Sequence, residues 1–303
     1  MRIAFFGTPE AAVPTLKALP DVGDVVGVIT RPDAARGRSR RPVPSPVAVL
    51  AEREGMPLHR PADRSELAAA VRDLAPFDVG VVVAYGMILR PEVLAVPGRG
   101  FVNVHVSVLP RWRGAAPVAR ALLAGDTRTG VTLMQMDEGL DTGPIIATWS
   151  TRIGPSEDAV DLTGRLATGG AKLAAATLRA HVEGRTAPTA QDESAAIYAD
   201  KLRSEERWLR PGDHAGAALQ RVRGLAGWPG AWIHHDTGPL RIHLAEPTAG
   251  EPGPGSVVVT GDRVLLGFEG GAIEARVVQP AGKRPMEARA WARGLQGEAG
   301  AFR

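Results

Sequence analysis

The alternation of strand and helix signals over the first hundred residues constrains the fold of this chain most strongly. Short apolar runs predict strands, and the amphipathic runs between them predict helices, one of which should begin at Pro46. A repeated strand-then-helix order favours an α/β fold in which a mainly parallel sheet carries helices on both faces. The predicted strands cover residues 2–6, 25–30, 79–84 and 101–106, and the predicted helices cover residues 11–19, 46–54 and 65–74.

A second pattern begins after Gly184. Residues 185–203 lack periodicity and predict a linker. Beyond them, one helix candidate and several short strands separated by glycine and proline predict a small barrel or sandwich. The chain therefore divides into an α/β domain over residues 1–184, the linker, and a β-rich domain over residues 204–303. In that last domain the predicted helix covers residues 215–222, and the predicted strands cover residues 231–234, 240–245, 256–260, 263–268 and 272–279.

Several classes of protein are excluded by what the sequence lacks. The 303 residues include no cysteine, which excludes disulfides, thiolate metal sites and cysteine nucleophiles. The turn that begins at Gly7 lacks the second and third glycines of a dinucleotide fingerprint, and no P-loop sequence occurs. The start of the chain is too short an apolar run for a signal peptide, and no run is long enough for a membrane span. We therefore expect a cytoplasmic protein that binds neither NAD nor a membrane.

Three polar residues point to chemistry near the end of the fourth predicted strand. Asn103 and His105 are two positions apart on that strand, so their side chains should leave the same face. Such a pair can transfer an acyl carbon without a metal if Asp141 folds back onto His105. Each residue also has an ordinary structural interpretation, since a lone histidine often only completes a hydrogen-bond network and Asn or Asp often caps a turn.

Arginine is concentrated between residues 31 and 41. Five arginines against the single acid Asp33 give this segment a charge of +4, which leaves −1 for the rest of a chain whose net charge is +3. Charge alone favours a solvated surface over a phosphate-binding site.

Motifs spread over nearly the whole chain resemble those of one enzyme family. They are Gly7-Thr-Pro9, Pro32-Asp33, Gly37-Arg38, Pro44-Ser-Pro46, Val83-Ala-Tyr-Gly86, Asn103-Val-His105, Ser107 to Pro117, Gly130 to Asp137, Gly139 to Gly143, Trp228 to Ala231 and Gly282 to Met286. In this order they are similar to the motifs of the methionyl-tRNA formyltransferases. The resemblance implies that the formyl group of 10-formyltetrahydrofolate passes, without a metal, to the α-amino group of methionine on initiator tRNA.

The resemblance also implies roles for the polar trio. Asn103 and His105 would stabilise the oxyanion that forms on the formyl oxygen, and His105 would protonate the departing folate nitrogen. Asp141 would orient His105, favour its charged form and help to receive the amine proton.

By the same resemblance, a loop formed by Ser107, Val108, Leu109 and Pro110 contacts folate, and Val83 and Tyr85 line the same cleft. Val108 departs from the leucine usual in the family, but it remains apolar and we expect a small effect. Val83 and Tyr85 equally suit a place in the core.

For tRNA, the resemblance assigns the key contact to Arg38, with Arg36, Arg40 and Arg41 as further candidates, because arginine suits phosphates and unpaired bases. It also implies an OB-like C-terminal barrel that binds tRNA. Its overall charge gives little support, since residues 204–303 carry twelve basic and eleven acidic residues. A monomer suffices for this chemistry.

Two alternatives remain. Glycinamide ribonucleotide and sugar-amine formyltransferases share the catalytic residues and the donor, but the basic loop and the β-rich second domain favour a tRNA acceptor. A noncatalytic RNA-binding protein would not need Asn103, His105 and Asp141 together.

Overall fold

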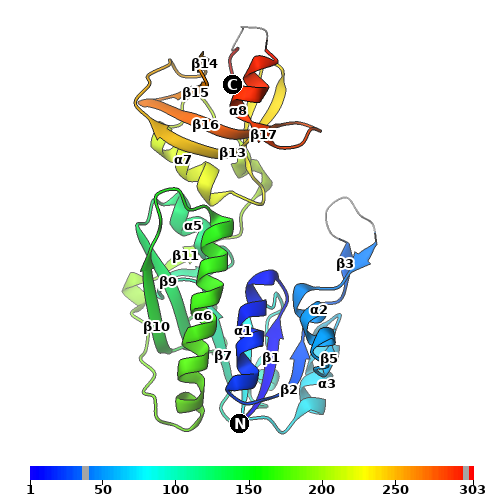
Figure 1. Cartoon of the computed structure of the whole chain (residues 1–303). Coiled ribbons are helices and arrows are strands. Elements are labelled where there is room, and N and C mark those ends of the chain that lie inside the picture. Colours follow the sequence, from blue (N-terminus) through cyan, green and yellow to red (C-terminus); the bar gives the residue numbers. More distant parts are fainter. Residues whose placement is uncertain (36–40, 296–299) are drawn as a thin grey trace. The chain divides into compact units, whose positions relative to one another are not determined.

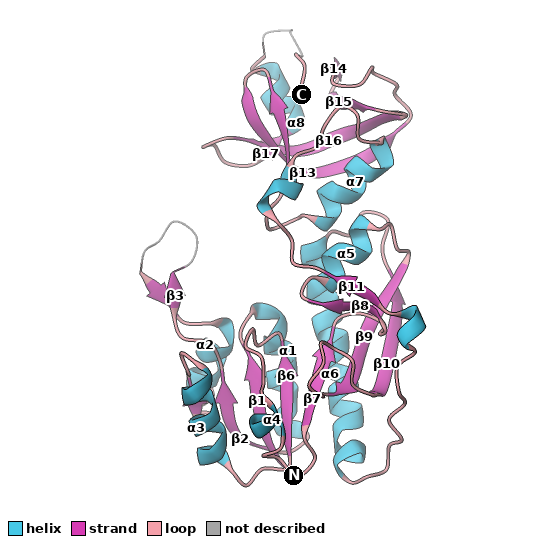
Figure 2. Cartoon of the chain, turned by 180° about the vertical axis from the view of Figure 1, so that it is seen from behind, coloured by secondary structure: helices cyan, strands magenta, loops and turns pink. Residues whose placement is uncertain are grey.

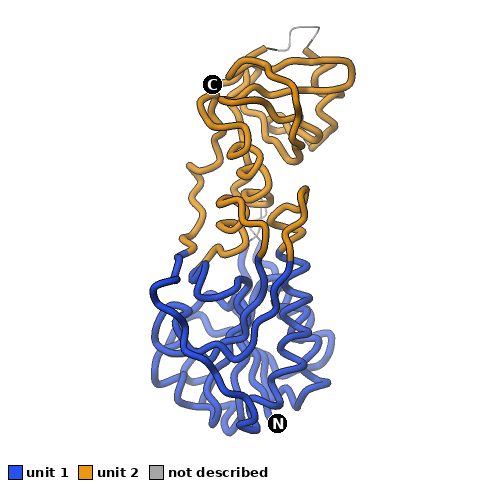
Figure 3. The backbone as a smooth tube through the Cα atoms, turned by 90° about the vertical axis from the view of Figure 1, so that its left-hand side faces the viewer, with its two compact units in different colours: residues 1–114, 129–151, 163–198 blue, residues 115–128, 152–162, 199–303 orange. Residues whose placement is uncertain are grey.

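The computed structural model describes residues 1–35, 41–295 and 300–303. These residues form two compact units (Figure 3). The first contains residues 1–114, 129–151 and 163–198, and the second contains residues 115–128, 152–162 and 199–303. Because two short segments of the N-terminal part belong to the second unit, the units do not follow one cut in the chain. The single boundaries at 184 and 204 remain predictions.

A seven-stranded sheet forms the centre of the first unit (Figure 1). Its order is β10 (Ile145–Arg152), β9 (Arg128–Gln135), β7 (Phe101–His105), β6 (Val79–Val83), β1 (Arg2–Gly7), β2 (Asp24–Ile29) and β5 (Leu58–His59). The strands from β7 to β5 pair in parallel, and β9 pairs antiparallel to β7. The predicted α/β class and mainly parallel sheet are thus confirmed.

Helices cover both faces of this sheet (Figures 1 and 2). On one face lie α1 (Val13–Ala18) and α6 (Ala159–Val182), and α2 (Pro46–Arg53) packs beside α1. The other face carries α3 (Arg64–Leu74) and α4 (Pro91–Leu94). The α2 helix begins as predicted, because Ser45 caps it by accepting a hydrogen bond from the Ala48 amide at 2.9 Å.

Two differences from the predicted helices have local causes. The helix expected over residues 11–19 is shorter and is flanked by 3₁₀ turns, since Pro14 and Pro20 each remove a main-chain donor. The long α6 helix was not predicted, because the adjacent glycines Gly169 and Gly170 weaken the helical signal of its sequence. Gly170 lies so close to Val104 that a Cβ there would sit 2.8 Å from its methyl group, so these glycines let α6 approach the sheet.

An aromatic cluster fills the core under α3 and α4. Phe6 meets Tyr85 and Phe101 edge to face, at ring distances of 5.7 and 5.1 Å. Such pairs stabilise by about 1 kcal/mol beyond their buried area. This cluster fixes the strand ends from which the polar residues project.

The second unit contains an antiparallel sheet in the order β12 (Ala231–His235), β13 (Gly238–Thr248), β16 (Gly271–Pro280), β15 (Arg263–Phe268) and β14 (Val257–Thr260), with β17 (Met286–Glu287) beside β16. The last residues join its two edges: the main-chain amide of Asp236 donates to the Ala301 carbonyl at 3.0 Å, and the main-chain amide of Phe302 donates to the Gly255 carbonyl at 2.7 Å. The β-rich domain predicted for this part of the chain is thus confirmed as an antiparallel sheet whose two edges are linked by the last residues. Helices α7 (Ala215–Gly224) and α8 (Ala288–Arg293) pack on it, and α5 (Pro117–Leu123) packs on α7.

Four short strands form two further pairs: β3 (Ala34–Ala35) pairs with β4 (Pro42–Val43), and β8 (Arg111–Gly114) pairs with β11 (Ile197–Ala199). In the described residues no helix is both long and apolar enough to cross a membrane.

Candidate active site

The β7 strand supplies two members of the polar trio. Val104 points toward α6, so its neighbours Asn103 and His105 project from the opposite face, as the two-residue spacing predicts. His105 is buried, with 6% of its side chain exposed. The strand thus aims an amide and an imidazole into one site.

The third member, Asp141, lies in a tight loop after β9. Its φ of +56° lies in the left-handed region, which costs a non-glycine residue about 1 kcal/mol. The Asp137 carboxylate shapes this loop by accepting hydrogen bonds from the Gly139 amide at 3.0 Å and the Thr142 hydroxyl at 2.8 Å. Gly143 passes so close to the Gln135 carbonyl that no Cβ would fit. The loop therefore holds Asp141 in a conformation that its sequence alone does not favour.

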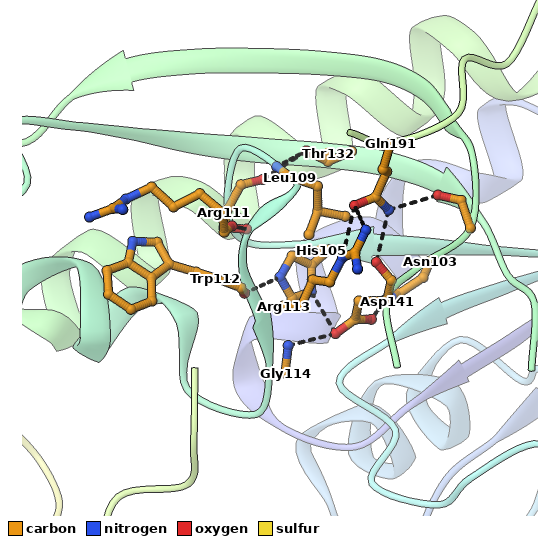
Figure 4. Close-up of polar contacts among 12 residues, drawn as sticks. Asn103, His105, Leu109, Arg111, Trp112, Arg113, Gly114, Thr132, Asp141 and Gln191 are labelled. Atoms are coloured by element: carbon orange, nitrogen blue, oxygen red, sulfur yellow. Dashed lines mark hydrogen bonds and ion pairs between the residues drawn. The ribbon is translucent and has the colours of Figure 1, made fainter. Parts of the chain in front are cut away.

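The Asp141 carboxylate is the meeting point of the trio (Figure 4). Its Oδ1 accepts a hydrogen bond from Asn103 Nδ2 at 3.2 Å. Its Oδ2 accepts another from the Gly114 amide at 2.8 Å and lies 3.6 Å from His105 Nδ1. The residues that the sequence placed 38 positions apart do meet in one site.

The imidazole of His105 faces an acceptor at each nitrogen. Nε2 lies 2.9 Å from the Trp112 carbonyl oxygen, which can only accept, so Nε2 carries a proton here. Nδ1 faces the Asp141 carboxylate, which also only accepts when ionised. A doubly protonated imidazole satisfies both partners. The site can therefore hold an acid ready to donate a proton.

Two further residues at this site were missed as functional candidates. Arg113 is fully buried, and Gln191 comes from the predicted linker. Gln191 Nε2 donates to the main-chain carbonyls of Asp141 and Gly143, both at 2.8 Å. A side chain whose role depends on contacts with residues distant in the chain leaves no pattern in the sequence, so spacing offered no signal for Gln191.

The predicted folate loop is held together by hydroxyl groups. The Ser107 hydroxyl donates to the Arg111 carbonyl at 2.7 Å. Thr132 of β9 bridges the loop, because its hydroxyl donates to the Ser107 carbonyl at 2.8 Å and accepts from the Leu109 amide at 3.1 Å. Ser107 and Leu109 are buried, whereas Val108 and Pro110 are half-buried. Only the latter two offer much surface to a ligand.

Val83 and Tyr85 are both buried at the end of β6. The Tyr85 hydroxyl has no hydrogen-bond partner among the described residues. Burial raises the pKa of Tyr85 to about 12, an effect partly opposed by the nearby Arg31. Tyr85 thus belongs to the core as well as to the edge of the site.

An open cavity of about 600 Å³ lies beyond the ends of β2 and β6. Gly86 and Met87 line it, and so do Arg31, Arg64 and Arg90. These three arginines, against the single carboxylate of Asp63 in the lining, favour an anionic ligand group.

The arginine-rich segment is only partly described. Its ends are β3 and β4, where Ala34 pairs with Val43 and Ala35 with Pro42, and Arg41 is exposed at this hairpin. Arg36, Arg38 and Arg40 lie outside the described residues. Across the described ranges, no three His, Asp or Glu side chains gather into a set that could hold a metal ion.

The class of protein follows from both parts of the chain, which match the two domains of one family: the protein is a formyl transferase. Residues 1–178 match the family described as formyl transferase, and residues 201–296 match its C-terminal domain.

Relatives with known names narrow the family. The chain is 46% identical to the methionyl-tRNA formyltransferase of Thermus thermophilus over 97% of its own length and 96% of that protein. It is 48% identical to that of Halorhodospira halophila over 95% and 94%. The chain belongs to the methionyl-tRNA formyltransferase family.

A solved structure shares the fold. It is the crystal structure of an N-formyltransferase from Helicobacter canadensis in complex with folinic acid and dTDP-3-aminofucose. The TM-score is 0.69 at 16% identity, covering 90% of this chain and 98% of that one.

Proposed function

We propose that the protein transfers the formyl group of 10-formyltetrahydrofolate to the α-amino group of methionyl initiator tRNA. The observation that carries this proposal is the convergence of Asn103, His105 and Asp141 at one carboxylate, in a chain of this family. The product is N-formylmethionyl-tRNA, the substrate that starts translation.

In the proposed reaction, the neutral amine attacks the formyl carbon and negative charge develops on the formyl oxygen. Asn103 Nδ2 has two hydrogens and gives one to Asp141, so the other is available to that oxygen. The protonated imidazole of His105 is the second donor through its Nδ1–H, because Nε2–H is bound to the Trp112 carbonyl and Nδ1 lies 3.6 Å from Asp141 Oδ2, beyond hydrogen-bond distance. Fixed donors of this kind contribute roughly 2.7 to 4 kcal/mol each.

Two proton transfers complete the proposed reaction. As the bond from the formyl carbon to the folate nitrogen breaks, His105 gives that nitrogen a proton. The attacking amine loses a proton, which Asp141 receives and returns to His105, so each turnover restores the starting protonation. The 3.6 Å from Asp141 Oδ2 to His105 Nδ1 supports this exchange.

We assign the donor to the cleft beside residues 107–110. Val108 and Pro110 would contact it directly because they retain exposed surface. Ser107 and Leu109 would act by holding the loop, and Val83 and Tyr85 by supporting the floor of the cleft from the core.

For the acceptor, we assign Arg38 and, beside it, Arg36, Arg40 and Arg41 to the tRNA. The exposure of Arg41 at the β3–β4 hairpin supports a basic loop that reaches a polyanion. We also propose that the protein acts as a monomer in the cytoplasm.

A competition between acceptors tests the proposal. Donor labelled in the formyl group is supplied with charged initiator tRNA, glycinamide ribonucleotide and an amino sugar nucleotide together. We expect label on the methionine α-amino group only. Label on either of the other acceptors would refute the proposed substrate.

A further inference from the structure

The segment that contains Gln191 is attached to the Asp141 loop by its main chain. Ile145 and Thr189 exchange both of their main-chain hydrogen bonds, at 2.8 and 2.9 Å. This bridge brings the segment beside the start of β10, one residue beyond Pro144. Gln191 follows two residues later and reaches the carbonyls of Asp141 and Gly143. The segment therefore belongs to the site and does not behave as a free linker.

The orientation of the Gln191 amide is fixed by Arg113. The Gln191 Oε1 atom accepts hydrogen bonds from Arg113 Nε at 3.0 Å and Nη2 at 2.9 Å. A flipped amide would face the guanidinium with its NH2 group and the two carbonyls with its oxygen, which would break four contacts. The NH2 group must therefore point at the Asp141 loop.

Arg113 is itself held in place by Glu193. The two groups form a bidentate ion pair, with Nη1 to Oε2 at 2.8 Å and Nη2 to Oε1 at 2.7 Å. This hydrogen bonding raises the pKa of Arg113 and lowers that of Glu193. A fully buried guanidinium held in a bidentate ion pair is a rigid support for the Gln191 amide.

The Asp141 loop is thus held by hydrogen bonds from two sides. On one side, the Gly114 amide, which directly follows Arg113, binds the carboxylate at 2.8 Å. On the other, Gln191 binds the main-chain carbonyls on either side of Thr142. Since the left-handed backbone of Asp141 is intrinsically unfavourable, these bonds decide where its carboxylate lies.

We propose that Gln191, supported by Arg113, is a positioning residue that holds the Asp141 carboxylate against His105. This inference rests on the proposed function, because Gln191 affects catalysis only if Asp141 has the catalytic role proposed above. This role requires no contact between Gln191 and either substrate.

The test uses Gln191→Leu, which keeps the size of the side chain and removes its hydrogen bonds. The matched control is Gln135→Leu, since the Gln135 amide bonds to His181 and to the Arg99 carbonyl, away from Asp141. We expect Gln191→Leu to lower kcat by ten- to a hundredfold and to leave both KM values within twofold. Gln135→Leu should keep kcat within twofold. Unchanged kcat in Gln191→Leu, or equal losses in both variants, would overturn the proposal.

A double-variant cycle separates positioning from general destabilisation. If Gln191 acts through Asp141, adding Gln191→Leu to Asp141→Asn should not lower kcat further. A second ten- to hundredfold loss would contradict the inference.

A measurement without substrate keeps this inference distinct from the proposed function. The ¹⁵N resonances of the His105 imidazole should shift in Gln191→Leu and stay in place in Gln135→Leu, whichever acceptor the enzyme uses. Identical His105 spectra in both variants would overturn the positioning role even if methionyl-tRNA is the acceptor.

Discussion

Asp141 Oδ1 accepts a hydrogen bond from Asn103 Nδ2 at 3.2 Å, across 38 positions of the chain. The same carboxylate lies within 3.6 Å of His105 Nδ1. One carboxylate therefore orients both groups to which we assign stabilisation of the oxyanion.

Asp141→Asn should lower kcat by at least a hundredfold, because an amide cannot receive the amine proton and turns a donor toward other donors. Asp262→Asn is the control, since the Asp262 side chain is 83% exposed and lies between β14 and β15 in the second unit. Its kcat should match that of the wild type. Both are measured at saturating substrates, with thermal unfolding recorded alongside. Retention of kcat by Asp141→Asn would show that the carboxylate is dispensable.

Thr132→Val should reduce the free energy of unfolding by about 1 to 3 kcal/mol, because the buried Ser107 carbonyl and Leu109 amide lose their shared partner. It should also raise KM for the folate donor, since residues 107–110 would loosen. Thr129→Val on the same strand is a matched control, because the buried Thr129 hydroxyl has no hydrogen-bond partner among the described residues. In urea unfolding, the free energy of unfolding of Thr129→Val should equal or exceed that of the wild type. The opposite ranking would contradict the role given to Thr132.

Tyr85→Phe tests the buried phenol. The pKa of Tyr85 is raised to about 12, whereas in the unfolded chain the phenol loses its proton near the ordinary pKa of 10.0. Between these values the folded protein binds more protons than the unfolded chain, so the free energy of unfolding should fall as pH rises from about 10 to about 12. Tyr85→Phe should lack this part of the decline.

Tyr85→Phe also removes a buried hydroxyl that has no hydrogen-bond partner among the described residues. Near pH 7 its free energy of unfolding should therefore exceed that of the wild type by up to about 1 kcal/mol. Urea titrations of both proteins across this pH range provide the comparison. Parallel pH profiles would show that Tyr85 does not titrate as its burial predicts.

Arg38→Ala should raise KM for charged tRNA more than KM for the donor. The slope of the logarithm of the tRNA binding constant against the logarithm of the salt concentration should also become shallower by about one. Arg185→Ala is the control, because Arg185 is an exposed side chain paired with Glu183. Its KM values should not change. Equal effects of Arg38→Ala on both substrates would contradict the assignment of the basic loop.

Period-two spacing predicted that Asn103 and His105 leave one face, since the pleat of a strand forces this result. The position of Asp141 did not follow from spacing, because it depends on a left-handed loop built by Asp137 and Gly143. Gln191 was not predicted as a site residue for a different reason. Its segment has no periodicity, and its function depends on an amide placed between a buried arginine and two carbonyls. Regular elements are encoded locally, whereas these contacts exist only after the chain has folded.

The most direct test of the account is the single-turnover rate of label transfer from 10-formyltetrahydrofolate to methionyl initiator tRNA by His105→Ala. We predict a loss of at least a thousandfold, with the thermal unfolding midpoint close to that of the wild type. A wild-type rate would remove His105 from the reaction and contradict the proposed mechanism.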